Sequence, residues 1–76
     1  MKKVYVMVVD ALTGISQNGM IEEPVKDGLE IQNALKHFGV ESGLIKWFCH
    51  NQIDITNICK MGIIEGTNKI VSIVTI

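Results

Sequence analysis

The chain begins with an unbroken run of apolar side chains from Val4 to Val9, and this run stops at Asp10. A strand with one solvated face alternates apolar and polar residues, whereas a strand that is covered on both faces does not. The run therefore predicts a buried strand with structure on each side, as in parallel sheets. Residues 69–76 are also rich in β-branched side chains and predict another strand.

The segment after Pro24 has the signals of a helix over residues 28–38. Asp27 and Glu30 have the spacing of a capping box, with Asp27 as the N-cap and Glu30 three residues later. Gly39 is a suitable residue to end the helix. One apolar stripe follows from the spacing of Ile31, Ala34, Leu35 and Phe38.

The remaining segments complete an alternating order of strands and helices. Residues 40–48 predict a strand. A second helix is predicted from a cap at Asn51 to an end at Gly62, with Ile55, Ile58 and Cys59 on its inner face. The pair Asn18-Gly19 predicts a β-hairpin over residues 15–21. We therefore expect residues 1–76 to form a single α/β domain. Its core would be minimal and Rossmann-like, with three layers, a short parallel sheet of about three strands, two helices and a projecting hairpin.

Composition limits the partners and the compartment. The 76 residues carry 7 basic and 8 acidic side chains, which excludes a strong electrostatic surface for nucleic acid or anionic membranes. The run at residues 4–9 is too short for a signal peptide or a membrane span, so we expect a cytoplasmic protein with Cys49 and Cys59 as reduced thiols. A chain of this length buries only about 60% of its unfolded surface, which favours self-association.

Asp10 is the residue at which chemistry is expected, because open parallel sheets hold ligands at the carboxyl ends of their strands. Two interpretations stay open. Asp10 could be a nucleophile or a Mg²⁺ ligand, since phosphoryl transfer and hard cations both use carboxylate oxygens. It could instead end the strand and accept hydrogen bonds from the turn that follows.

Several segments resemble one enzyme family. Residues 8–14 resemble a shortened first motif of the haloacid dehalogenase (HAD) superfamily, in which an apolar strand is followed by D-x-D-x-T. Residues 18–31, with Asn18-Gly19 and Lys26-Asp27-Gly28, resemble its 3-deoxy-D-manno-octulosonate 8-phosphate phosphatase family. The resemblance extends over roughly residues 4–70. It implies a HAD-like fold, Mg²⁺ as cofactor, phosphoryl transfer to Asp10, and a homotetramer assembled through the hairpin.

The chain also departs from the motifs of that family. Leu12 stands where the second Asp belongs, and Lys46 or Trp47 stands where a Ser or Thr holds the phosphoryl group. No counterpart of the later lysine and acidic pair is present in the 76 residues. Lys46 could bind phosphate as a point charge or be a solvated surface lysine, and Lys26 could contact an anion near the start of the helix.

Three functions follow as hypotheses. The first is a truncated HAD-like homologue, catalytically impaired or inactive, that acts as an oligomeric binding or regulatory protein, with a small anionic metabolite or a related full-length enzyme as partner. The alternative is a Mg²⁺-dependent phosphatase that hydrolyses a small phosphorylated sugar acid through an aspartyl-phosphate on Asp10. The third is an unrelated small α/β oligomer that matches the pattern by chance.

Overall fold

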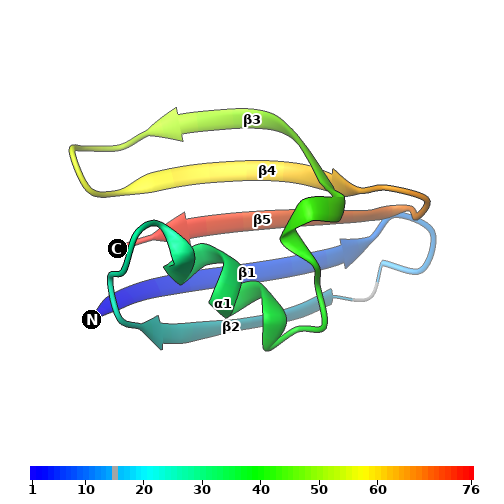
Figure 1. Ribbon diagram of the computed structural model, residues 1–76. Coiled ribbons are helices and arrows are strands. Elements are labelled where there is room, and N and C mark those ends of the chain that lie inside the picture. Colours follow the sequence, from blue (N-terminus) through cyan, green and yellow to red (C-terminus); the bar gives the residue numbers. More distant parts are fainter. Residues whose placement is uncertain (15) are drawn as a thin grey trace.

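The computed structural model describes residues 1–14 and 16–76, and five of its segments form one antiparallel sheet in the order β2-β1-β5-β4-β3 (Figure 1). The helix α1 lies over one face of this sheet and contacts β1 and β2 (Figure 1). A short 3₁₀ turn at Ser42–Leu44 joins the helix region to β3. The bounds are Lys2–Asp10 for β1, Ser16–Glu23 for β2, Leu29–Lys36 for α1, Ile45–Gln52 for β3, Ile58–Ile64 for β4 and Lys69–Thr75 for β5.

The expected Rossmann-like α/β core with a parallel sheet is wrong, and so is the HAD-like architecture that the resemblance implied. β1 lies between β2 and β5, and it is antiparallel to both. The apolar run at residues 4–9 does mark a strand with two apolar faces. It does not require parallel neighbours, however, and only one of its faces is covered by the helix.

The predicted second helix from Asn51 to Gly62 is also wrong, because this segment forms the end of β3, a turn and β4. Asp54 determines the turn: its Oδ1 accepts hydrogen bonds from the backbone N–H groups of Thr56 and Asn57, each at 2.9 Å. Such an Asx turn competes with helix formation. The apolar residues of this segment have helical spacing, but Ile58 and Cys59 lie in β4, where successive residues face opposite sides of the sheet.

The predicted hairpin over residues 15–21 is not found. Residue 15 lies outside the described residues, and residues 16–21 belong to β2, where Asn18 pairs with Met7 and Gly19 with Val6. Gly19 has a packing role instead of a turn role, since a Cβ atom there would lie 3.3 Å from Cζ of Phe38. The turn after β1 is made by residues 11–14, where Gly14 has a φ of 73° and its N–H donates to the Asp10 carbonyl at 2.8 Å.

One predicted helix and three predicted strands are found at or near their expected positions. The helix expected over residues 28–38 is α1, and Gly39, with a φ of 71°, reverses the chain just after it. The strands expected over residues 4–9 and 69–76 are β1 and β5. The strand expected over residues 40–48 overlaps β3, which begins later, at Ile45, and continues to Gln52. The cap differs from the prediction, because Gly28 is the N-cap residue without a side-chain hydrogen bond and Asp27 precedes it with a φ of 53°.

The core lies between α1 and the sheet. Alternate residues of the two central strands point toward the helix and pack with it and the segments that follow it. The buried apolar residues are Val4, Val6, Val8, Ala34, Leu35, Val40, Ile45, Val71 and Ile73.

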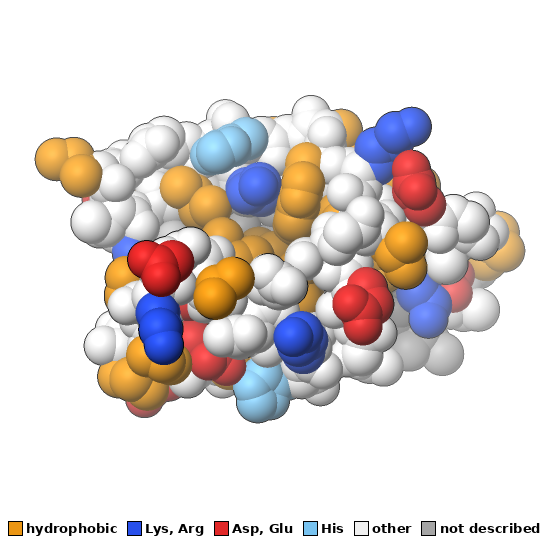
Figure 2. Space-filling model, in the orientation of Figure 1, with side chains coloured by type: hydrophobic (Ala, Val, Ile, Leu, Met, Phe, Trp, Pro, Cys, Tyr) orange, Lys and Arg blue, Asp and Glu red, His pale blue; other side chains and the backbone are white. Residues whose placement is uncertain are grey.

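The helix does not cover the whole of this face. Figure 2 shows hydrophobic side chains between α1 and the strands at the β3 edge. There the ammonium of Lys60 lies 4.4 Å from the centroid of the Trp47 ring, and this cation–π contact covers part of the apolar surface that the helix leaves open.

No helix among the described residues is long and apolar enough to cross a membrane.

Candidate functional site

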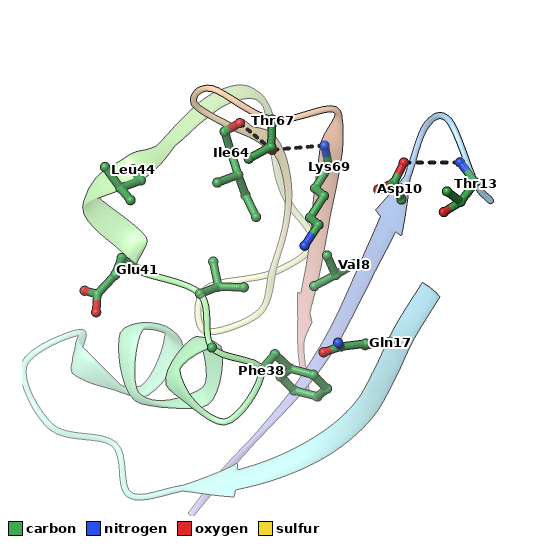
Figure 3. A pocket seen from close by; sticks show the side chains of 12 residues that line it. Val8, Asp10, Thr13, Gln17, Phe38, Glu41, Leu44, Ile64, Thr67 and Lys69 are labelled. Carbon is green, nitrogen blue, oxygen red and sulfur yellow. Dashed lines mark hydrogen bonds between the residues drawn. The ribbon is translucent and has the colours of Figure 1, made fainter. Parts of the chain in front are cut away.

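A cavity of about 410 Å³ lies at the end of the sheet where β1 ends and β5 begins (Figure 3). It is bounded by the sheet on one side and by residues 38–44, which follow α1, on the other. The turn after β1 and the turn between β4 and β5 flank its mouth. The residues that line it are Val8, Asp10, Thr13, Gln17, Phe38, Gly39, Val40, Glu41, Leu44, Ile64, Thr67 and Lys69. Its volume lies within the range of about 300–1,000 Å³ that is usual for small-molecule sites.

The apolar part of the cavity comes from both layers of the fold. Val8 and Ile64 contribute from the sheet, and Phe38, Val40 and Leu44 contribute from the segment after α1. The positive φ of Gly39 lets the chain turn back over the sheet, and the Val40 N–H then donates to the Leu35 carbonyl at 3.1 Å. The same turn that ends the helix therefore forms the wall of the cavity.

Lys69 supplies a cation to the lining of this cavity and is itself exposed. It is the first residue of β5 and the direct cross-strand partner of Asp10. Its side chain reaches from the strand toward the middle of the cavity (Figure 3). The start of β5 is fixed by Thr67, whose hydroxyl donates to the Ile64 carbonyl at 2.8 Å and accepts the Lys69 N–H at 3.1 Å. Among residues 1–14 and 16–76, no carboxylate forms an ion pair with the Lys69 ammonium.

Asp10 lies at the rim of the same cavity and stabilises the turn that follows β1. Its Oδ1 accepts hydrogen bonds from the backbone N–H groups of Leu12 at 2.8 Å and Thr13 at 3.2 Å. Figure 3 shows the bond from Thr13. This geometry is that of an Asx turn, so it supports the interpretation in which Asp10 ends the strand and organises the turn after it. Its Oδ2 accepts no hydrogen bond from the described residues and is available to a ligand.

The structure does not bring the two predicted phosphate-binding lysines to Asp10. Lys26 lies in the loop between β2 and α1, at the end of β1 where Lys2 lies, so the length of the strand separates it from Asp10. Lys46 is exposed on β3, three strands away from β1, or about 14 Å at the usual spacing of about 4.8 Å between strands. Its side chain alternates with the buried Ile45 and therefore lies on the face opposite α1.

The donor groups near Asp10 do not match the needs of Mg²⁺. This cation prefers several oxygen ligands, and here one carboxylate faces an ammonium across the strand pair. No group of three or more His, Cys, Asp or Glu side chains in the described part of the chain could hold a metal ion. The Mg²⁺ expectation therefore has no matching set of ligands, and no chemical step is derived from it.

Sequence reasoning missed Lys69, although it placed a strand there. The cross-strand pairing with Asp10 depends on an antiparallel sheet, and nothing local at residues 67–70 indicates which strand will be the neighbour. No known family model, curated protein or solved structure matches the chain. The interpretation of the site therefore rests on its geometry.

Proposed function

We propose that this protein binds a small amphipathic carboxylate in the cavity at the end of its sheet, without a catalytic step. An α-amino acid with an apolar side chain suits the site best. The observation that carries the proposal is the Lys69 ammonium, which points into a cavity with apolar walls and has no ion-pair partner in the described part of the chain.

Each part of such a ligand has a counterpart in the cavity. The ligand carboxylate would accept a charge-assisted hydrogen bond from Lys69, which contributes about 1.5–3 kcal/mol in proteins. The ligand ammonium would lie against Oδ2 of Asp10, the cross-strand partner of Lys69. The apolar side chain would pack on Phe38, Val40 and Leu44.

The charges of the lining favour a zwitterion over a strong anion. Asp10 and Glu41 are acidic and Lys69 is basic, so the lining carries a formal charge of −1. A doubly charged phosphate ester would meet one cation and two carboxylates, which costs free energy through like-charge repulsion. We therefore narrow the small anionic metabolite expected from the sequence to a ligand that also carries a positive group.

A phosphatase reaction is not part of this proposal. It required Asp10 at the carboxyl end of a strand in a parallel sheet, and β1 has only antiparallel neighbours.

We further propose that the protein works in the cytoplasm, where two free thiols such as Cys49 and Cys59 would stay reduced.

Three probes that share an isobutyl group test the proposal by thermal unfolding. L-leucine carries both charges, 4-methylpentanoate lacks the amine, and 3-methylbutylamine lacks the carboxylate. At ten times the dissociation constant a ligand stabilises the fold by about 1.4 kcal/mol, which raises Tm by roughly 6–11 °C in a domain of this size. L-leucine should give the largest shift of the three.

Two variants assign the contacts. Lys69→Met should abolish the shift with L-leucine, whereas Lys46→Met, the same change on the opposite face, should leave it unchanged. Asp10→Asn, which can keep the turn hydrogen bonds through its amide oxygen, should weaken L-leucine and improve 4-methylpentanoate. No shift with any probe at about 10 mM, or an equal shift in the Lys69 and Lys46 variants, would contradict the proposal.

A further inference from the structure

The face of the sheet opposite α1 is apolar over its three central strands. Val4, Val6 and Val8 point toward the helix, so the residues between them point the other way. The strand registers place side chains of β5 and β4 beside them on that face. We call these nine residues the open-face patch: Tyr5, Met7, Val9, Ile70, Ser72, Val74, Cys59, Met61 and Ile63.

Every member of the open-face patch except Ser72 is apolar, and none is buried. Ile63 is 37% exposed, and the others are partly exposed between their neighbours on the strands. A solvated face of an antiparallel sheet normally carries polar residues, which gives the strand its alternation. The missing alternation at residues 4–9 therefore indicates that this second face is also covered in the working protein.

The two outer strands carry both polar and apolar residues beside the open-face patch. On β2, Asn18 pairs with Met7 and Met20 with Tyr5. On β3, Asn51 pairs with Cys59, Lys46 with Ile63 and Cys49 with Met61. Met20 and Cys49 extend the apolar surface, and the two asparagines and Lys46 give it polar margins, as in the usual anatomy of a protein–protein interface.

We propose that a second copy of this chain covers the open-face patch, so that two sheets pack face to face with their helices outside. Five strands about 4.8 Å apart and about seven residues long give a face of roughly 550 Å². Two such faces in contact would remove roughly 1,100 Å² from water, just below the range of about 1,200–2,000 Å² for stable interfaces and above the roughly 800 Å² of most crystal contacts. A dimer of this kind would therefore use the whole five-strand face, with the open-face patch at its centre and β2 and β3 at its margins.

Charge also permits two copies to meet through this face. The chain carries a formal net charge of −1, so two copies repel each other only weakly. The open-face patch contains no charged residue, and the charged side chains that share its face, Lys3, Glu22 and Lys46, belong to its margins. Association would also offset the marginal stability of a lone chain of this length.

The experiment measures the mass of the protein in solution by light scattering at about 100 μM. The wild type should have twice the 8.4 kDa mass of one chain. Met61→Glu, which places a charge at the centre of the open-face patch, should give a single chain that stays folded by circular dichroism. Ile55→Glu is the matched control, because Ile55 is 93% exposed in the β3–β4 turn and outside the patch; it should remain a dimer.

A second measurement uses the wild type alone, in case the Met61 variant does not fold. The methyl signals of Met7 and Met61 should shift between about 10 and 500 μM in nuclear magnetic resonance spectra, whereas those of Ile55 should not. A wild type that stays monomeric at 100 μM would overturn the proposal and assign the face to a different partner. An assembly that persists unchanged in Met61→Glu would also overturn it.

Discussion

Gly62 offers a test of the packing between the two strands at the β3 edge. It lies in the middle of β4 and pairs with Trp47, beside an irregularity in β3 between Trp47 and Cys49. A Cβ atom at this position would lie 2.5 Å from Cγ2 of Ile45, 2.9 Å from the Lys46 carbonyl oxygen and 2.9 Å from Cε3 of Trp47. Ordinary contacts between carbon atoms are about 3.5–4.0 Å, so Gly62→Ala requires its neighbours to move.

The cost follows from which neighbours must move. Ile45 is a core residue, and the Lys46 carbonyl belongs to the β3 backbone, so the methyl group cannot be accommodated by a flexible side chain alone. Overpacking of this kind costs about 1–3 kcal/mol, and the lower chain entropy of the unfolded alanine variant returns about 0.4–1 kcal/mol. We expect a net loss of about 1–2 kcal/mol, which corresponds to a fall in Tm of roughly 4–16 °C.

Thermal unfolding followed by circular dichroism measures this effect, and urea unfolding gives the free energy. Gly43→Ala is the control, because a Cβ atom there would have no neighbour within 4 Å. It should leave Tm unchanged or slightly raised. Equal stability of the Gly62 and Gly43 variants would refute the close approach of β3 and β4 on which this prediction depends.

Two further predictions concern the core and the acid stability. Leu35 is fully buried in α1, so Leu35→Ala should cost about 2–5 kcal/mol in urea unfolding; a smaller loss would show that the helix does not pack on the sheet as described. Backbone N–H groups of Thr56 and Asn57 hold the pKa of Asp54 below its ordinary value. This stabilisation is therefore present above the pKa of Asp54 in the unfolded chain and is lost as the pH falls through its folded pKa. The urea midpoint should fall less between pH 6 and pH 3 in Asp54→Asn than in the wild type, and an equal fall would contradict the role of the Asp54 turn.

The elements that sequence reasoning placed correctly are those with strong local signals. The helix was predicted from one apolar stripe and from Gly39, and both features also appear in the structure. The first and last strands of the chain, β1 and β5, were predicted over residues 4–9 and 69–76 from apolar and β-branched runs. What these runs cannot convey is the direction of the neighbouring strand, because a strand with two apolar faces occurs in both kinds of sheet.

The wrong predictions have a common physical cause. In each of them the local sequence is compatible with two structures, and long-range packing decides which one forms. Gly19 resembles a turn residue, but the ring of Phe38 requires the space above it. Ile55, Ile58 and Cys59 have helical spacing, but the Asx turn at Asp54 interrupts the segment. The candidate site shows the same pattern, because Asp10 was identified as a strand-ending residue while its partner Lys69 depends on the sheet order.

The most direct test of the proposed ligand site is a titration of isotopically labelled protein with L-leucine, followed by backbone amide signals. The largest shifts should lie at Val8, Val40 and Lys69 around the cavity, and Lys69→Met should remove them. Shifts centred instead on the loop that contains Lys26, or none at all at about 20 mM L-leucine, would contradict the proposed ligand site.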